Sequence, residues 1–429
     1  MLRSNNESTE RPERAILVGV ELGGKSQIAG EDSLAELASL AKSAGAEVSG
    51  QVRQNLKEID SRTFIGKGKV GEVRTVAGER GASLTIFDDS LSPAQARNLE
   101  KELDLRVIDR SQLILDIFAQ RARTLEGKLQ VEVAQLSYLQ PRLTRQWTHL
   151  SRLAGGASAG GRIGTRGPGE TQLEVDRRRV RERLTRLKRR LGEVERTRSL
   201  QRARRAEAEF PTVALVGYTN SGKSTLMNRL TGAGVEVADR PFSTLDPTIR
   251  RLRLPDGVQL MVIDTVGFIH RLPHLLVEAF KATLEEVRTA SLLLHVVDAS
   301  SPLWREQMEV VDRVLEEIGA GASPRIVVMN KADLIDTPRR PLDAFETVTT
   351  SALKGEGLAS LLAAIGRFFS NLRQEVRVTL PAARGDLIAM ARREGLVLSE
   401  EYEDGRVSMR ALVSAAVAGR LRKAAVADT

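Results

Sequence analysis

Short apolar runs alternate with helical patterns over the first 110 residues of the chain. The runs at 15–22, 83–88 and 105–110 are rich in Val, Ile and Leu, and they predict buried strands. Segments with apolar residues at helical spacing lie between the runs, and one of them opens with a Ser-Pro pair. Because this alternation is typical of a mostly parallel sheet, we expect residues 1–110 to form an α/β domain.

Two long apolar stripes at helical spacing follow, one at 125–143 and one at 173–194. Thr171 opens a capping box, which marks the start of the second helix. The stretch between the stripes, 154–170, is rich in glycine. Two helices with apolar seams and a connecting loop predict a coiled-coil-like helical hairpin over 111–210.

A second alternation of strand and helix patterns runs from 211 to 372, with a hairpin of strands expected at 251–267. It predicts another α/β domain with a mostly parallel sheet. The last segment, 373–429, combines a strand pattern, a helical stretch and a strand pair around a turn at 403–405. We expect that segment to form a small α+β domain.

The bulk composition is that of a soluble globular protein. The 429 residues are 41% hydrophobic and 28% charged, and roughly two to four domains are expected for this length. No apolar run is long enough to span a bilayer, and the first residues lack the apolar core of a signal peptide. The chain has no cysteine, which excludes disulfides, thiolate catalysis and zinc–cysteine sites. We expect a cytoplasmic protein, and a monomer.

The positive charge is concentrated. The formal net charge is +9, and the segment 141–210 carries the whole of that excess. A concentrated basic stripe suggests a polyanionic partner, first of all a nucleic acid. The alternative is a solvated helix face that happens to be rich in arginine.

The stretch from Gly217 to Ser224, GYTNSGKS, has the pattern of a P-loop between a predicted strand and a predicted helix. Backbone N–H groups of such a loop surround phosphates. Lys223 would neutralise the β and γ oxygens, and the Ser224 hydroxyl would bind Mg²⁺. The alternative is a chance match in a glycine-rich turn. Asp264 and Gly267 then form a DxxG at a strand end, which predicts a second Mg²⁺ contact through water and an amide near the γ-phosphate.

The stretch Asn330-Lys331-Ala332-Asp333, which follows another strand, predicts which base the bound nucleotide carries. The Asp333 carboxylate can accept from N1–H and from the exocyclic amine of guanine. Adenine lacks that amine and has an acceptor at N1, so it would leave the carboxylate unpaired. Lys331 would pack its stem along the base, and the Ala352 amide of Ser351-Ala352-Leu353 would contact guanine O6.

Between the P-loop and Asp264, the segment Pro241–Thr248 is expected to move with the nucleotide and to place Thr244 or Thr248 on Mg²⁺. The alternative is a surface turn. At Phe268, directly after the DxxG, Ras-like enzymes carry a glutamine that orients water. Because an apolar side chain cannot polarise water, we expect slow unassisted hydrolysis and stimulation by a partner.

The stretches GGRIGTRGPGETQLE, GYTNSGKSTLMNRLT, FSTLDPT, DTVGFI and NKAD together closely resemble the HflX family of ribosome-associated GTPases, which are related to the translation factors. The resemblance implies GTP hydrolysis, Mg²⁺ dependence, binding to the large (50S) ribosomal subunit, and a role in splitting stalled ribosomes or in subunit maturation. It favours Thr244 as the switch threonine. It also implies that the glycine-rich loop reaches ribosomal RNA near the peptidyl-transferase centre.

A glycine-rich loop gains by ordering only if its binding site makes many close contacts, as an RNA cavity does. The alternative is a disordered linker between helices. The candidate RNA contacts are Trp147, Arg152, Arg162, Arg166, Arg177, Arg178 and Arg179. Trp147 could equally anchor the hairpin.

We therefore expect a GTPase of the large subunit, with Lys223, Thr244 and Gly267 as the catalytic residues and Mg²⁺ on Ser224, Thr244 and Asp264. One alternative is a nucleotide-gated RNA-binding protein in which hydrolysis is incidental. Another is an assembly GTPase of the Obg or Era type, which the glycine-rich hairpin argues against. The residues expected to contact GTP are Gly217, Tyr218, Thr219, Asn220, Ser221, Gly222, Lys223, Ser224, Thr225, Phe242, Ser243, Thr244, Leu245, Asp246, Asp264, Thr265, Val266, Gly267, Asn330, Lys331, Ala332, Asp333, Ser351, Ala352 and Leu353.

Overall fold

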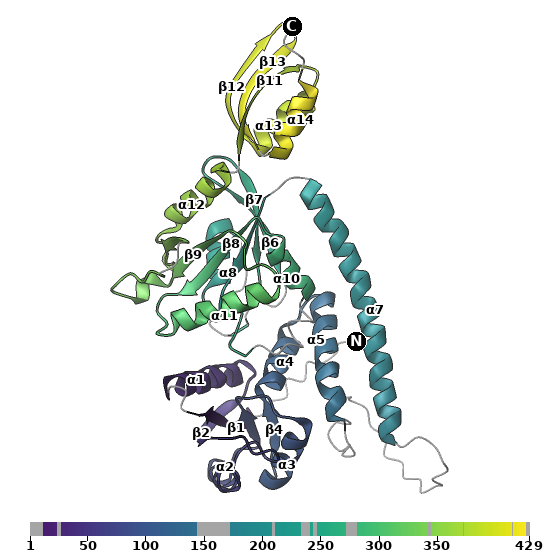
Figure 1. The fold of residues 1–429 in the computed structure, drawn as a ribbon, viewed down its shortest axis with the longest axis vertical. Helices are drawn as coiled ribbons and strands as arrows, with labels where there is room; N and C mark the ends of the chain where they lie inside the picture. Colours follow the sequence, from purple (N-terminus) through teal and green to yellow (C-terminus); the bar gives the residue numbers. More distant parts are fainter. Residues whose placement is uncertain are drawn as a thin grey trace, which may run out of the picture. The chain divides into compact units, whose positions relative to one another are not determined.

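The computed structural model contains three sheets (Figure 1). The chain divides into two compact units and passes from the first to the second between Val194 and Glu195. The structure describes residues 12–23, 27–143, 172–207, 211–232, 241–242, 247–271, 281–341, 345–371, 373–413 and 415–425.

The first sheet has four parallel strands in the order β2-β1-β3-β4. Helix α1 lies on one face of this sheet, and α2 and α3 lie on the other (Figure 1). Helix α3 begins with the Ser-Pro pair seen in the sequence, because the Ser92 side chain and Gln95 form a capping box. The bounds are β1 Arg14–Leu22, α1 Gln27–Ser43, β2 Glu47–Leu56, α2 Lys67–Arg80, β3 Leu84–Phe87, α3 Pro93–Leu103 and β4 Arg106–Asp109.

The helical hairpin packs along the predicted seam. Leu129 and Val133 of α5 are buried against Leu184 and Leu187 of α7. The helices run antiparallel, since Arg183 near the middle of α7 pairs with Glu132 at 2.7 Å, whereas the carbonyl of Leu143, just past α5, accepts from Arg177 at 3.1 Å. The bounds are α5 Leu125–Leu139, the 3-10 helix η1 Gln140–Arg142, and α7 Gln172–Glu207.

A further helix, α4 (Arg110–Arg121), precedes the hairpin and packs against α1 and α5. The sequence pattern does not separate it from the stripe that follows. Its residues Leu113, Ile114, Leu115, Ile117 and Phe118 are all buried, and between 112 and 118 only Gln112 and Asp116 are polar, so the helical period is weak.

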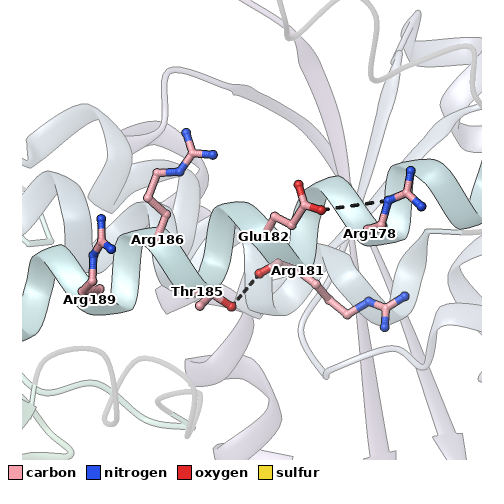
Figure 2. Close-up of a pocket in the computed structure, with 6 residues that line it drawn as sticks. All are labelled: Arg178, Arg181, Glu182, Thr185, Arg186 and Arg189. Atoms are coloured by element: carbon pink, nitrogen blue, oxygen red, sulfur yellow. Dashed lines mark hydrogen bonds and ion pairs between the residues drawn. The ribbon is translucent and has the colours of Figure 1, made fainter.

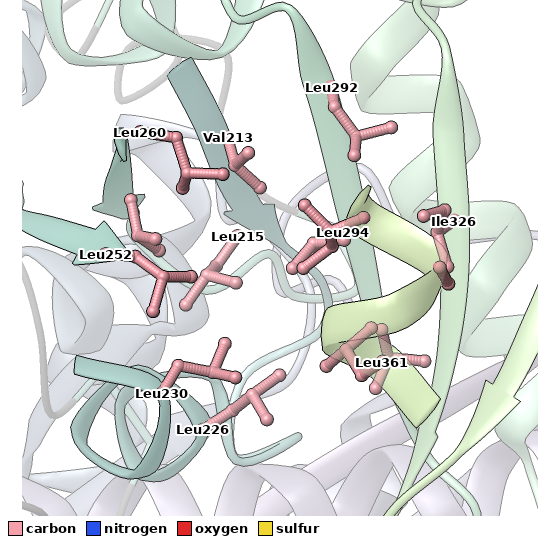
Figure 3. Packing of buried hydrophobic residues seen from close by; sticks show 14 of the residues in the cluster. Val213, Leu215, Leu226, Leu230, Leu252, Leu260, Leu292, Leu294, Ile326 and Leu361 are labelled. Carbon is pink, nitrogen blue, oxygen red and sulfur yellow. The ribbon is translucent and has the colours of Figure 1, made fainter. Parts of the chain in front are cut away.

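The second sheet has six strands in the order β10-β9-β8-β5-β7-β6, and only the β6–β7 pair is antiparallel. This confirms the mostly parallel sheet. Leucines of β5, β8 and α8 form its largest core, together with Ile326 of β9 and Leu361 of α12 (Figure 3). The bounds are β5 Thr212–Val216, α8 Lys223–Thr231, β6 Thr248–Arg253, β7 Gln259–Asp264, α10 Lys281–Arg288, β8 Leu292–Asp298, α11 Trp304–Glu317, β9 Arg325–Asn330, the 3-10 helix η2 Ala332–Leu334, β10 Glu346–Thr349 and α12 Leu358–Asn371.

The third sheet is antiparallel, in the order β11-β13-β12, and α13 and α14 pack on it. The expected turn joins β12 and β13 through Asp404 and Gly405, whose φ angles are 45° and 72°. Its bounds are β11 Gln374–Pro381, α13 Gly385–Glu394, β12 Leu396–Glu403, β13 Arg406–Val413 and α14 Ala415–Ala424. Every helix in the described ranges is too short or too polar to cross a lipid bilayer.

Candidate nucleotide-binding site

The P-loop follows β5 and leads into α8, at the carboxyl end of the parallel strands. Gly217 has φ 152° and Gly222 has φ 91°. A Cβ atom would lie 2.2 Å from the Val296 carbonyl at Gly217 and 2.3 Å from Asn330 Nδ2 at Gly222. Both the backbone conformation and the space therefore require glycine, and they bring the loop against β8 and β9.

Lys223 is held inside this loop. Its Nζ donates to the carbonyls of Gly217 at 3.1 Å and Tyr218 at 2.8 Å, and the residue is only 6% exposed. Burial lowers the pKa of Lys223 to about 8, and the carboxylate of Asp264 opposes that shift. The buried Ser221 hydroxyl has no hydrogen-bond partner within the described residues. A dry pocket with an ammonium group and a spare hydroxyl suits anionic oxygens.

Ser224 and Asp264 meet beside the loop. The Ser224 hydroxyl donates to Asp264 Oδ2 at 2.7 Å, and both side chains are buried. A hydroxyl and a carboxylate are the oxygen ligands that Mg²⁺ prefers, so these residues fit that ion. The described residues contain no group of three or more His, Asp or Glu side chains that could hold a metal. A cation here would need further oxygens from substrate phosphates or water.

The segment after β7 is paired to the P-loop. Thr219 N–H donates to the Phe268 carbonyl at 2.7 Å, and Phe268 N–H donates to the Gly217 carbonyl at 3.1 Å. A Cβ at Gly267 would lie 2.8 Å from Thr219 Cα and 3.0 Å from Lys223 Nζ. The Phe268 side chain is 1% exposed, so it belongs to the core.

The two candidate switch threonines differ in what the structure shows. Thr244 lies outside the described residues, together with Ser243, Leu245 and Asp246. Thr248 is the first residue of β6 and pairs in register with Asp264. Phe242 has φ 57°, and its N–H donates to the Thr219 hydroxyl at 3.3 Å. Thr219 of the P-loop therefore contacts both Phe242, which precedes β6, and Phe268, which follows β7.

Asn330 connects its own motif, Asn330–Asp333, to the P-loop and to the segment Ser351–Leu353. Its Nδ2 donates to the Ser221 carbonyl at 2.9 Å, and its Oδ1 accepts from Ala352 N–H at 2.9 Å. The side chain is 1% exposed. The amide expected to reach guanine O6 is thus already bonded to Asn330.

Lys331 and Asp333 follow Asn330. Lys331 has a left-handed backbone, with φ 60°, and its Nζ pairs with Asp298 Oδ2 at 2.7 Å. Asp333 is half-buried in η2. Asp298 is not among the residues expected from the sequence, although an acid at the end of the buried strand β8 is a usable signal.

The candidate RNA contacts fall into two groups. Trp147, Arg152, Arg162 and Arg166 lie outside the described residues, as does the whole glycine-rich stretch 154–170. The other three lie on α7, and each has a contact within the protein. Arg177 donates to the Leu143 carbonyl, Arg178 lies 3.9 Å from Glu182, and Arg179 lies 3.7 Å from Asp176.

A surface pocket of about 410 Å³ opens on α7 (Figure 2). We call its lining the arginine face: Arg178, Arg181, Glu182, Thr185, Arg186 and Arg189. Their spacing of three and four residues repeats over three helical turns. The guanidinium groups extend away from the helix (Figure 2). Of these six residues, only Arg178 is among the candidate RNA contacts expected from the sequence, although the spacing of three and four residues was a usable signal for the others.

Four family models match successive parts of the chain. They are described as GTP-binding GTPase N-terminal at 31–119, GTP-binding GTPase Middle Region at 121–205, 50S ribosome-binding GTPase at 212–331, and HflX C-terminal domain at 339–425.

Curated relatives named GTPase HflX match nearly the full length. The relative from Caldanaerobacter subterraneus subsp. tengcongensis is 46% identical, over 96% of this chain and 93% of its own. The relative from Escherichia coli is 46% identical, over 92% of each chain. A crystal structure of a GTP-binding protein from the archaeon Sulfolobus solfataricus in complex with GDP is 24% identical, over 84% of this chain and 99% of its own, with a TM-score of 0.44.

Proposed function

This chain belongs to the HflX family of GTPases, and from that premise we propose that it binds the large ribosomal subunit and uses GTP hydrolysis to leave it. The role would be the splitting or rescue of stalled ribosomes or the biogenesis of the subunit, in the cytoplasm where ribosomes are. The match of residues 212–331 to a 50S ribosome-binding GTPase carries this proposal. The arginine face of α7 supports it.

We assign the phosphates to the P-loop. Lys223 would neutralise the β and γ oxygens from its buried position, and Ser221 would offer its hydroxyl to them. Ser224 and Asp264 would hold Mg²⁺, Asp264 through water, and Thr244 would join them in the triphosphate state. The ion, when bound, neutralises charge that develops on the phosphate oxygens. The N–H of Gly267, where an added Cβ would lie 3.0 Å from Lys223 Nζ, would sense the γ-phosphate.

Guanine specificity is assigned to Asp333. Asn330 fixes the relation between the P-loop and the loop of Ser351–Leu353, and the Lys331–Asp298 pair fixes the segment that carries Asp333. The carboxylate would accept from N1–H and from the exocyclic amine, which adenine cannot match.

Slow hydrolysis in the absence of a partner follows from Phe268. Its side chain is packed in the core, where it cannot orient a water molecule. The attacking water must be positioned by backbone, by another side chain or by the partner. We propose that the large subunit completes this arrangement, so that GTP turnover rises when the protein is bound.

The arginine face would meet the phosphates of ribosomal RNA. From Arg178 to Arg189 it extends over eleven residues, or about 17 Å along the helix, which spans several phosphate groups of a strand. With the glycine-rich loop beyond α5, it would form the RNA-binding part of the molecule.

The test is sedimentation with 70S ribosomes and with separated subunits. We expect a non-hydrolysable GTP analogue to hold the protein on the large subunit and GDP to release it. GTP turnover should rise with purified large subunits and should vanish in Lys223→Ala. Equal sedimentation with the analogue, with GDP and without nucleotide would instead indicate an RNA-binding protein in which hydrolysis is incidental. Absence from all ribosomal fractions would reject the proposal.

A further inference from the structure

Arg229 lies on α8 and reaches across to the loop of residues 351–355. Its Nε donates to the Ala352 carbonyl at 3.0 Å, and its Nη2 donates to the Leu353 carbonyl. It lies in the stretch that follows the P-loop but is not among the residues expected to contact GTP, and it is exposed at the surface. A guanidinium that grips two successive carbonyls fixes the two peptide planes to which those carbonyls belong.

The backbone donors of this loop are almost all used. Ser351 N–H donates to Glu356, and Gly355 N–H donates to Ser351. Ala352 N–H donates to Asn330, and Lys354 N–H donates to the Ser351 hydroxyl at 3.1 Å. Within the described part of the chain, Leu353 N–H is the backbone donor of this loop for which no acceptor is present.

Leu353 N–H and the Ala352 carbonyl belong to the same peptide group. In a planar trans peptide these two groups point in opposite directions. Because Arg229 draws the Ala352 carbonyl toward α8, the Leu353 N–H is turned away from α8. The positive charge of the Arg229 guanidinium beside that carbonyl also polarises the peptide, which makes the Leu353 N–H a stronger donor.

We propose that Arg229 is a positioning residue for guanine specificity: it fixes the Ala352–Leu353 peptide so that Leu353 N–H donates to O6 of the base. This inference rests on the proposed assignment of Ser351–Leu353 to the base. Adenine carries an amino group at the O6 position, so two donors would face each other and binding would be disfavoured. Asp333 would read N1–H and the exocyclic amine, and the peptide held by Arg229 would read O6 beside them on the same edge of guanine.

The same arginine joins two parts of the site. Lys223, at the start of α8, belongs to the phosphate pocket, and Arg229 lies nearly two turns further along the same helix. A shift of α8 would therefore move the base loop together with the P-loop.

The experiment compares the dissociation constants of GDP, IDP and 6-thio-GDP in the full chain. IDP lacks the exocyclic amine that Asp333 would read, whereas 6-thio-GDP keeps that amine and replaces O6 with the weaker acceptor sulfur. The variants are Arg229→Met, which keeps the stem without the donors, and Arg229→Lys, which can serve one carbonyl. The matched control is Arg313→Met, because Arg313 is exposed and donates only within α11.

We expect Arg229→Met to weaken the binding of GDP and of IDP by the same factor, roughly fivefold. The binding of 6-thio-GDP should weaken by clearly less. Arg229→Lys should lie in between, and Arg313→Met should match the wild type. The KM for GTP should rise with little change in kcat, since the arginine does not touch the phosphates. An unchanged affinity for GDP, or an equal loss for all three nucleotides, would overturn the role of Arg229. If the wild type binds GDP and 6-thio-GDP equally well, the assignment of the loop to O6 fails as well.

Discussion

His295 is a buried histidine whose burial makes the stability of the protein depend on pH. It lies in the middle of β8, 1% exposed, between Val216 of β5 and Val327 of β9. Its Nδ1 has no hydrogen-bond partner in the described ranges. Burial, together with the positive charges of Arg325 and Lys223, lowers the pKa of His295 to about 3. The imidazole is therefore neutral at physiological pH.

Acid should destabilise the protein through His295. The folded pKa is about 3 and the unfolded value about 6.5, so the unfolded state takes up the proton first as pH falls. This contribution to stability is complete above pH 6.5 and is lost below it, by about 2 kcal/mol at pH 5. Urea denaturation of wild type and His295→Gln at pH 8 and pH 5 measures it. We expect the variant to lose about 2 kcal/mol less between these pH values. An equal loss in both proteins would contradict this.

Asp333 offers a change of base. In Asp333→Asn the side-chain amide would donate where the carboxylate accepted, so GDP should bind about a hundredfold more weakly. Xanthosine diphosphate, whose base has a carbonyl in place of the exocyclic amine, should bind better than it does to wild type. Equilibrium titration of both nucleotides is the measurement, with the exposed Asp336→Asn as control. Parallel losses for both nucleotides would argue against the assigned role of Asp333.

Among the elements, the end of α5 is tied firmly to the first sheet. Arg142 stacks over the Tyr138 ring at 3.6 Å and donates to the Leu91 carbonyl at 2.6 Å and to Asp109 Oδ2 at 3.2 Å. Burial, with the charge of Asp109 nearby, raises the pKa of Tyr138 well above its usual range. Arg142 of η1 is thus fixed to the loop after β3 and to the last residue of β4.

Removing this anchor should be costly. Arg142→Met would leave the Asp109 carboxylate, which is 1% exposed, without its cationic partner. We expect a loss of about 2 kcal/mol in the unfolding free energy, because a buried charge loses its compensation. Hydrogen exchange should show faster exchange of the amides of Leu91 and Gln112. Unchanged exchange at both amides would show that Arg142 is not an anchor.

The role of the arginine face in binding can be tested against basic residues elsewhere on α7. Arg186→Gln with Arg189→Gln should weaken binding to the large subunit roughly tenfold and reduce the slope of log affinity against log salt by about 1 to 2. The control pair, Lys188→Gln with Arg190→Gln, removes the same charge from exposed positions outside the pocket. Equal effects of the two pairs would mean that only the total charge matters.

At the scale of the whole molecule, the cores are separate. The sheet of β11, β13 and β12 has its own cluster around Leu380, Met409 and Leu421, distinct from the core around Leu215 and Leu294. The described residues assigned to GTP lie on the strands of the second sheet, on α8 and η2, and on the loops between them. Folding of the nucleotide site should not depend on the C-terminal domain.

Removal of residues 373–429 tests this separation. The shortened protein should bind GDP within about twofold of the full chain and should hydrolyse GTP at the same unassisted rate, because no residue of the pocket is lost. Fluorescence titration and single-turnover hydrolysis provide the measurements. A loss of GDP binding with the second sheet still folded would show that the domains are coupled.

The sequence by itself determined the fold class and identified the protein as a GTP-binding GTPase. Strand and helix periods repeat over short distances, and the motifs of a P-loop GTPase are local patterns whose chemistry requires particular residues at fixed spacing. The P-loop glycines were identified for the same reason, since their positive φ angles leave few alternatives.

The tertiary structure decided what depends on residues far apart in the chain. The partner of Ala352 N–H is Asn330, and the grip of Arg229 on the loop after β10 spans 123 positions. Which arginines of α7 line the surface pocket depends on which face of the helix packs on α5. The neutral state of His295 depends on its burial between two strands. The local periods of the sequence show which face of an element is buried, but they do not show which distant residues meet there.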